Sequence, residues 1–459
     1  MGSIRSQANG DGNHEASHEK ADARADSILP THERESHPNR YVLGLFRVNS
    51  AGESGRSGFH PVHFFHVCFR SVCTASMMVN FLWPFVPAAI AIHFARPDLH
   101  VWVFALNYIA MVPSANLLGF AGGELAKKLP KILGVLLETT LSAVVELVLF
   151  MVLLHNHRPG EHNLIPVIQA AILGSILANL LLCLGGCFFV GGLRRNEQVF
   201  HEAVSEVGTG LLLVAGFGLL IPSAFYTALK GAVNTHFTIE HLNHSALKIS
   251  RATAIILLVA FIVYLVFNLH SHNSIFDEIL ENDEAQDEDR DMELNRNKLT
   301  FVECILAIAI ALTCVCMSAV FLVQEIEHIV ELGVPDNFMG LILVPLVEKA
   351  AEHLTAVDEA WDNQINFALF HCLAPSIQTA LLNAPLAVIV GWCLDKDMSL
   401  NFEIFMVVLL VLAILVVGNF LRDGKSNYLE GSLLMLVYLI IAVTSWYYPE
   451  VKEAATNQA

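Results

Sequence analysis

Residues 164–190 read LIPVIQAAILGSILANLLLCLGGCFFV, an apolar run in which no side chain carries a charge. A helix needs about twenty consecutive apolar residues to cross the hydrocarbon core of a bilayer. The run is longer than that, and Ser175 and Asn179 are polar residues near its middle. It therefore predicts a membrane-spanning helix with a polar patch at mid-membrane depth.

Similar apolar runs recur along the chain, and about eleven of them are long enough to be predicted as transmembrane helices. They cover residues 71–95, 101–121, 132–154, 164–190, 202–229, 247–270, 299–324, 336–357, 365–392, 400–421 and 427–448. The fold class expected from this pattern is an all-α integral membrane protein.

The composition of the chain supports this class. Of the 459 residues, 54% are hydrophobic and 15% are charged, which is too apolar for a soluble protein, even one with a single membrane anchor. We expect a protein that lies in membrane lipid and carries something across the bilayer, rather than an enzyme, and we expect no cofactor. The nine cysteines include no CxxC pair, so we interpret them as core residues rather than as a disulfide or zinc framework.

Polar segments flank and divide the apolar runs. Residues 1–60 are rich in Ser, His, Glu and Gly and are predicted to form a disordered cytoplasmic tail without a signal peptide, and residues 449–459 form a C-terminal tail. Between Asp277 and Glu293, ten of seventeen residues are Asp or Glu. We interpret residues 271–298 as a solvated acidic linker, with calcium sensing as the alternative. The net charge of −18 makes nucleic acid an unsuitable partner.

Basic residues predict the orientation, because Lys and Arg near the ends of membrane helices are retained in the cytoplasm. They cluster in the loops after the second, fourth and tenth runs: Lys127, Lys128 and Lys131, then Arg194 and Arg195, then Arg422 and Lys425. This pattern places the N-terminus and the acidic linker in the cytoplasm, and the C-terminus across the membrane. The Asn-x-Ser sequon at Asn243 then falls in a loop outside the cytosol, where it is a glycosylation candidate.

The two halves of the chain on either side of the acidic linker resemble each other. In the first half, SAVVE at residues 142–146 precedes GSILAN at 174–179. In the second half, EKAAEH at 348–353 precedes APSIQ at 374–378. With five runs in each half, repeats at 101–270 and 299–448 insert with opposite orientations, and the run at 71–95 is an extra helix. This is the inverted-repeat plan of secondary transporters, whose site lies at the midplane where the repeats meet.

Glu146 and Glu352 are the carboxylates at matching positions of the two halves. A carboxylate at the bilayer centre is costly, so it persists where it faces a cavity, pairs with a cation or takes up a proton. The polar residues expected around the pair are Ser175, Asn179, Ser376 and Gln378. Oxygen ligands of this kind suit a metal cation such as Ca2+, and burial favours protonation once the cation has left. The pattern predicts one site for cations and protons.

Simpler interpretations remain open for each of these residues. Glu146 or Glu352 can pair within the helix bundle, and serine, asparagine and glutamine side chains also join membrane helices to one another. His353, which follows Glu352, can relay protons or be held by interior hydrogen bonds.

Several segments carry a family resemblance. They are PSANLLGFAGGELA at 113–126, QAAILGSILANLLLCLGGCFFVGGLRRNEQ at 169–198, residues 264–276, AAEHLTAV at 350–357 and residues 375–392. The chain resembles the calcium/proton exchangers of the calcium/cation antiporter superfamily, in particular the vacuolar type of fungi and plants. The resemblance spans residues 75–448 and implies transport of Ca2+ from the cytosol into an acidic vacuole, driven by returning protons. An acidic cytoplasmic linker is also a trait of this family.

The chain departs from the family where the site is expected. The family signature is Gly-Asn followed three residues later by Glu. Each Glu is present here, but Ser142 and Ala143 replace the first Gly-Asn, and Glu348 and Lys349 replace the second. A further difference is that the family's Gly-Ser-Ser reads Ala374, Pro375 and Ser376, and proline removes a backbone donor.

Lys349 bears most directly on ion selectivity. On a helix it shares a face with Glu352 and His353, so its ammonium can compete with a divalent cation, or it can snorkel to the membrane surface or pair with a distant acid. Glu146, Glu348, Lys349 and Glu352 together carry a formal charge of −2, as two glutamates alone would. We therefore expect a cation/proton antiporter with altered selectivity. The alternative is a relative that has lost transport and serves a regulatory or structural role.

Overall fold

The computed structural model describes residues 59–71, 74–157, 163–231, 238–288 and 296–448. Contacts divide the chain into residues Met1–Arg47 and Val48–Ala459, and every described residue belongs to the second unit. The predicted C-terminal tail lies outside the described residues, and so does the predicted N-terminal tail apart from residues 59 and 60.

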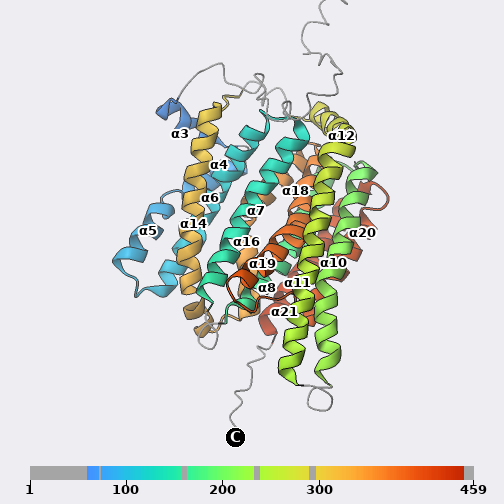
Figure 1. Ribbon diagram of the computed structural model, residues 1–459. Helices are drawn as coiled ribbons and strands as arrows, with labels where there is room; N and C mark the ends of the chain where they lie inside the picture. Colours follow the sequence, from blue (N-terminus) through green and yellow to red (C-terminus); the bar gives the residue numbers. More distant parts are fainter. Residues whose placement is uncertain (1–58, 72–73, 158–162, 232–237, 289–295, 449–459) are drawn as a thin grey trace, which may run out of the picture. The chain divides into compact units, whose positions relative to one another are not determined.

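Helices occupy each of the apolar runs (Figure 1). The first helix, α3 (Pro61–Arg70), precedes the apolar runs, and the first run contains α4 (Thr74–Val79), η2 (Asn80–Leu82) and α5 (Phe85–Ala95). The second and third runs are the single helices α6 (His100–Ala126) and α7 (Lys131–Asn156), and the fourth contains α8 (Ile165–Leu177), the π-helical η3 (Ala178–Cys183) and α9 (Leu184–Arg194). The last two runs before the linker are α10 (Glu202–Lys230), and α11 (Ile239–Val266) with the π-helical η4 (Phe267–Ser271).

The helices after the linker occupy the five later apolar runs. They are α14 (Phe301–Glu331), then α15 (Asp336–Phe338), the π-helical η5 (Met339–Leu343), α16 (Val344–Glu348) and α17 (Ala350–Trp361), then α18 (Ile365–Gln378), the π-helical η6 (Thr379–Asn383) and α19 (Ala384–Cys393), and finally α20 (Ile404–Phe420) and α21 (Tyr428–Tyr447).

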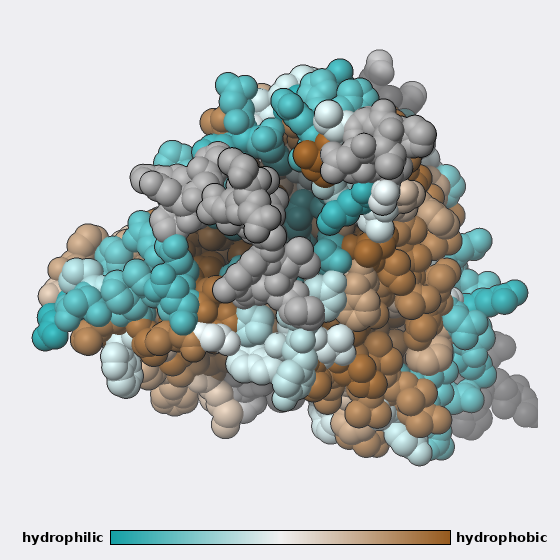
Figure 2. Space-filling model, turned by 90° about the horizontal axis from the view of Figure 1, so that it is seen from below, coloured by the Kyte–Doolittle hydropathy of each residue, from teal (hydrophilic) through white to brown (hydrophobic). Residues whose placement is uncertain are grey.

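The helices have the length and surface of membrane spans. Among the described residues, eight are long and apolar enough to cross a bilayer, and shorter apolar helices cover residues 143–156 and 404–420. The exposed side chains of α11 include Ile256, Val259 and Val263, as expected where helices face lipid. Figure 2, seen from below Figure 1, shows broad areas of hydrophobic surface beside separate hydrophilic groups. The protein is an all-α integral membrane protein.

Several helices extend beyond the predicted runs. Helix α6 ends at Ala126 rather than at residue 121, and α14 ends at Glu331 rather than at residue 324. The added turns contain polar residues, which a helix can carry where it leaves the hydrocarbon region. The predicted loop around Asn243 is wrong for the same reason, because Asn243 is an exposed residue in the first turns of α11.

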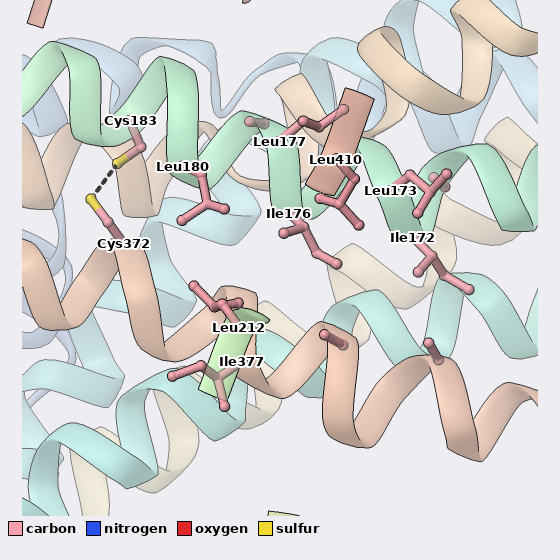
Figure 3. Close-up of a cluster of buried hydrophobic side chains, with 14 of the residues drawn as sticks. Ile172, Leu173, Ile176, Leu177, Leu180, Cys183, Leu212, Cys372, Ile377 and Leu410 are labelled. Carbon is pink, nitrogen blue, oxygen red and sulfur yellow. Dashed lines mark hydrogen bonds between the residues drawn. The ribbon is translucent and has the colours of Figure 1, made fainter. Parts of the chain in front are cut away.

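The interior is packed by helices from both halves of the chain. Figure 3 shows Ile172, Ile176 and Leu180 of α8 and η3 facing the same apolar space as Ile377 of α18. Glycines let two backbones cross nearby, since a Cβ atom at Gly174 would collide with the carbonyl of Leu341, and one at Gly340 would lie 2.7 Å from the carbonyl oxygen of Val167. Small residues at such crossings are typical of membrane helix packing.

Loops that carry basic residues lie together at one end of the bundle. The strands β1 (Gln198–Val199) and β2 (Lys425–Ser426) pair antiparallel, which joins the loop after α9 to the loop after α20. Arg194 Nη2 lies 2.8 Å from Glu288 Oε2 of the linker. Beyond the linker, the Leu299 N–H donates to Glu124 Oε2 at 3.2 Å, next to the loop between α6 and α7.

The acidic linker contains a helix, α12 (Asn273–Gln286). Its buried residues are Phe276, Ile279, Leu280 and Asp283. Apart from the adjacent pair Ile279 and Leu280, their spacing of three and four residues is the pattern of one helix face. The charge run had suggested a solvated linker, but this part of the linker packs against the bundle. Its other acidic side chains include Glu278, which is exposed.

Asp283 fixes α12 to the start of α18. Its Oδ2 accepts from the backbone N–H of Asn366 at 2.7 Å and of Phe367 at 3.1 Å, and its Oδ1 accepts from Asn366 Nδ2 at 2.7 Å. Burial raises the pKa of Asp283, and these three hydrogen bonds oppose that shift because they favour the carboxylate. The carboxylate satisfies N–H groups that the first turn of a helix leaves without partners.

We expect Asp283→Ala to loosen α12 from α18, because the substitution leaves buried donors unpaired at a cost of about 1–3 kcal/mol. Hydrogen–deuterium exchange of residues 273–286 in the full-length protein measures this directly. Exchange should accelerate in Asp283→Ala and stay unchanged in Glu278→Ala, which alters an exposed acid of the same helix. Equal protection of α12 in both variants would show that Asp283 does not anchor it.

Candidate functional site

Glu146 lies on α7 in the interior of the bundle and is fully buried. Its Oε2 accepts hydrogen bonds from Thr379 Oγ1 at 2.6 Å and from Asn383 Nδ2 at 3.0 Å. Both donors belong to η6, in the second half of the chain. Its Oε1 has no hydrogen-bond partner among the described residues, so the carboxylate keeps an acceptor position open.

Lys349 lies between the two predicted carboxylates. Its Nζ is 3.6 Å from Glu146 Oε2 and 3.7 Å from Glu352 Oε2, and the lysine side chain is 1% exposed. The residue separates α16 from α17, where the backbone has φ −91° and ψ −2°. The ammonium is therefore an interior cation that joins α7 to α17, and it does not snorkel to the surface.

The charges of this cluster are strongly coupled. Opposite charges about 4 Å apart attract by roughly 4 kcal/mol at an effective dielectric constant near 20, and Lys349 has two such partners. Glu348 is also buried and lies within electrostatic range of Glu146, Lys349 and Glu352. Removing one partner from a buried ion pair typically costs about 3–5 kcal/mol, because a charge is left uncompensated. The cluster needs a cation to be stable while its glutamates are charged.

Two of the other predicted site residues, His353 and Asn179, form a second polar contact. His353 Nε2 and Asn179 Oδ1 are 3.0 Å apart, which connects α17 to η3. Ser175 is buried at the end of α8, and its hydroxyl makes no hydrogen bond within the described part of the chain. Ser376 Oγ donates to the backbone carbonyl of Cys372 at 2.9 Å, and Gln378 is buried at the end of α18.

Ala143, one of the two residues that replace the first Gly-Asn pair, contributes a backbone carbonyl. The carbonyl oxygen of Ala143 accepts from Asn383 Nδ2 at 3.2 Å. The side chain of Ser142 lies outside the described residues. Asn243, the glycosylation candidate, is remote in sequence from the cluster and exposed on α11.

A cavity opens beside the charged cluster. Its lining includes Glu348, Glu352, Thr355, Asn116 and His371. Glu352 is 22% exposed at its side chain, whereas Glu146 is 0% exposed. The two carboxylates thus differ in access, since Glu352 borders the cavity and Glu146 lies behind Lys349.

Thr379 and Asn383 are site residues that the sequence interpretation missed. Counted from Ser376, they stand at the third and seventh positions, and this spacing places all three on one face of a helix. That polar stripe within an apolar run was the available signal. The contact with Glu146 itself joins segments far apart in the sequence.

The profile of the family described as "Sodium/calcium exchanger protein" matches residues 99–270 and 304–447. These two ranges cover more than half of the chain and include every residue of the cluster. The chain belongs to this exchanger family. The match is divided into two parts, and the acidic linker falls between them.

Curated members of the exchanger family place the chain in its cation/proton exchanger branch. Vacuolar cation/proton exchanger 5 of Arabidopsis thaliana is 35% identical over 416 residues, which are 89% of this chain and 90% of the relative. The vacuolar calcium ion transporter of Schizosaccharomyces pombe is 33% identical over 349 residues, 76% of this chain and 80% of the relative. These relatives are transporters and not enzymes.

Solved structures of exchangers share the fold. The structure of native YfkE superposes with a TM-score of 0.62 at 25% identity, covering 80% of this chain and 99% of that one. The H+/Ca2+ exchanger CAX gives a TM-score of 0.57 at 13% identity, covering 82% of this chain and 90% of that one, a likeness that concerns the fold alone.

Proposed function

We propose that the protein is a secondary active transporter that exchanges a cation for protons across the vacuolar membrane. The observation that carries the proposal is the convergence of Glu146 and Glu352 on one buried cation, the ammonium of Lys349, at 3.6 and 3.7 Å. Two carboxylates from different halves of the chain that hold an ammonium are placed to hold a metal ion. On the relatives' names alone, Ca2+ is the favoured cargo, because the fungal relative is named as a calcium ion transporter.

Proton exchange follows from the same geometry. Glu146 is fully buried, and a lone carboxylate in such a place is costly. When a cation leaves, a proton can neutralise the carboxylate in its place. The cavity beside Glu352 gives ions a route to the cluster, and Glu146 is the inner group that they reach second.

Lys349 makes this site different from a pair of free carboxylates. A metal ion must displace the ammonium from Glu146 or Glu352, so we propose that the native protein binds Ca2+ weakly or prefers another cation. The adjacent Glu348 offers the displaced ammonium an alternative partner. The second candidate function is a transport-inactive relative, in which Lys349 replaces the cation permanently and the protein serves a regulatory or structural role. The same two ion pairs favour it.

The inverted-repeat architecture is part of the proposal. We propose eleven spans, with α4–α5 as the extra helix and five spans in each of the ranges 101–270 and 299–448. Support comes from the matching breaks, since η3 begins three residues after Ser175 and η6 begins three residues after Ser376. The strongest support for two facing repeats is that Glu146 of α7, in the first half, accepts hydrogen bonds from Thr379 and Asn383 of η6, in the second half.

The orientation is also a proposal. The basic loops after α9 and α20 and the acidic linker lie at one end of the bundle. Positive charge at that end favours the cytoplasm, so the linker and the N-terminus are cytoplasmic. The opposite end then faces the vacuolar lumen.

Glu146→Gln and Glu352→Gln should each abolish cation/proton exchange, because each removes one charge and one proton carrier while nearly preserving shape. The measurement is cation uptake, driven by a proton gradient, into vesicles that contain the purified protein. Glu206→Gln, which alters an exposed glutamate of α10, should retain native uptake. Normal uptake by Glu352→Gln would remove this residue from the proposed site.

Glu348→Gly combined with Lys349→Asn should create or strengthen Ca2+/proton exchange, because the competing ammonium is removed and the charge of the cluster stays the same. Lys349→Arg keeps a cation and should leave Ca2+ uptake as low as in the native protein. The same vesicle assay compares the three proteins. Equal, robust Ca2+ uptake by the native protein and the double variant would contradict the role given to Lys349. Failure of every variant to move any cation would favour the transport-inactive alternative.

A protease site inserted into the 271–298 linker should be cleaved in sealed vacuoles, because that end of the bundle is proposed to face the cytoplasm. The same site inserted at residues 232–237, between α10 and α11, should be cleaved only after the membrane is permeabilised. Immunoblotting of the fragments reads out both cases. The reverse pattern would invert the orientation.

A further inference from the structure

Two histidines and a glutamate meet at the end of the bundle opposite the linker. His100 is the first residue of α6, and Glu325 and His328 lie near the C-terminal end of α14, at its lower end in Figure 1. One ligand atom from each of the three side chains lies within 4.8 Å of the others. The site is distinct from the Glu146 cluster, because the two groups share no residue and lie on different helices, α6 and α14 here and α7, α16 and α17 there.

The three side chains form a shallow site with a buried floor. Glu325 is 7% exposed at its side chain, whereas His100 and His328 are 40% and 42% exposed. His100 Nδ1 is 2.7 Å from Glu325 Oε2. The two imidazole rings lie with their centroids 3.7 Å apart and their planes tilted by 30°. An ion from solution can therefore reach the ring nitrogens, while the carboxylate below them is shielded from water.

The residue types and their spacing are those of a transition-metal site. Two imidazoles and one carboxylate are a recognised ligand set for zinc, which leaves a fourth position for water. Glu325 and His328 form a Glu-x-x-His pair on successive turns of α14, an arrangement that helical metal proteins use to direct two ligands at one ion. Ligands of a tetrahedral zinc ion lie about 3.3 Å apart, so small side-chain rotations close the site.

Neighbouring groups hold the ligands in place. His328 Nδ1 is 3.7 Å from Glu331 Oε2, and a carboxylate at this ring nitrogen orients a histidine so that its other nitrogen faces a metal. One turn earlier on α14, the ring of Phe321 stacks on His93 of α5 with centroids 3.8 Å apart. Helices α6 and α14 pack against each other, so the ligands stand on rigid elements, as a preformed site requires.

We propose that His100, Glu325 and His328 bind a divalent transition metal of the zinc class. The bound ion would join the N-terminal end of α6 to the C-terminal end of α14, across the two halves of the chain. Imidazole nitrogens favour zinc over Ca2+, which prefers oxygen ligands. The site would therefore select against Ca2+, the cation that the fungal relative is named for.

Titration of zinc into the full-length protein, purified without a histidine tag and held in detergent, tests the proposal by calorimetry. One zinc ion should bind per chain, and an excess of Ca2+ should not displace it. His100→Gln, Glu325→Gln and His328→Gln should each weaken binding by more than about tenfold. His244→Gln is the matched control, since it alters an exposed histidine of α11, and it should bind zinc like the native protein.

Two further variants separate loss of the site from loss of the fold and from binding elsewhere. His328→Cys supplies another zinc ligand at the same position and should retain tight binding, with a sulfur-to-metal absorption band when Co2+ replaces zinc. Glu352→Gln, in the proposed transport site, should leave zinc affinity unchanged. Zinc affinity that is equal in the native protein and in His328→Gln, or that is lost only in Glu352→Gln, would overturn the proposal.

Discussion

The interaction on which the site depends is the neutralisation of buried carboxylates by Lys349. Glu146 is fully buried, and Glu348 is nearly so. Lys349 provides the compensating cation through contacts to Glu146 and Glu352. Because an unpaired charge in this environment would cost several kcal/mol, helices α7, α16 and α17 are held together by electrostatics as well as by packing.

Helix α18 links this cluster to the acidic linker. At its start, Asp283 of α12 binds the first-turn N–H groups. At its end, η6 presents Thr379 and Asn383 to Glu146. The anchor of α12 and two of the partners of Glu146 are therefore attached to the opposite ends of one helical segment, α18 with η6.

The sequence predicted the parts of the structure that depend on neighbouring residues better than the contacts between distant segments. The apolar runs at 202–229 and 427–448 correspond closely to α10 and α21, because the length of a membrane span is a local property. The helix within the linker was missed because its charge run outweighed the four residues of its buried face. The contact of Glu146 with Asn383, and the meeting of His100 with His328, depend on how distant helices pack, and no single segment encodes that.

The two halves of the chain treat their carboxylates differently. Thr379 and Asn383 stand third and seventh after Ser376, and the residues third and seventh after Ser175 are Ala178 and Leu182, which cannot donate hydrogen bonds from their side chains. Glu146 thus receives two donors from the opposite half, while Glu352 faces the cavity. Lys349 shares a helical segment with Glu352 but not with Glu146. In the proposed exchange, movement of one half against the other would therefore break the Lys349–Glu146 pair first, and it would open Glu146 to a proton or a metal ion while the ammonium stays with Glu352.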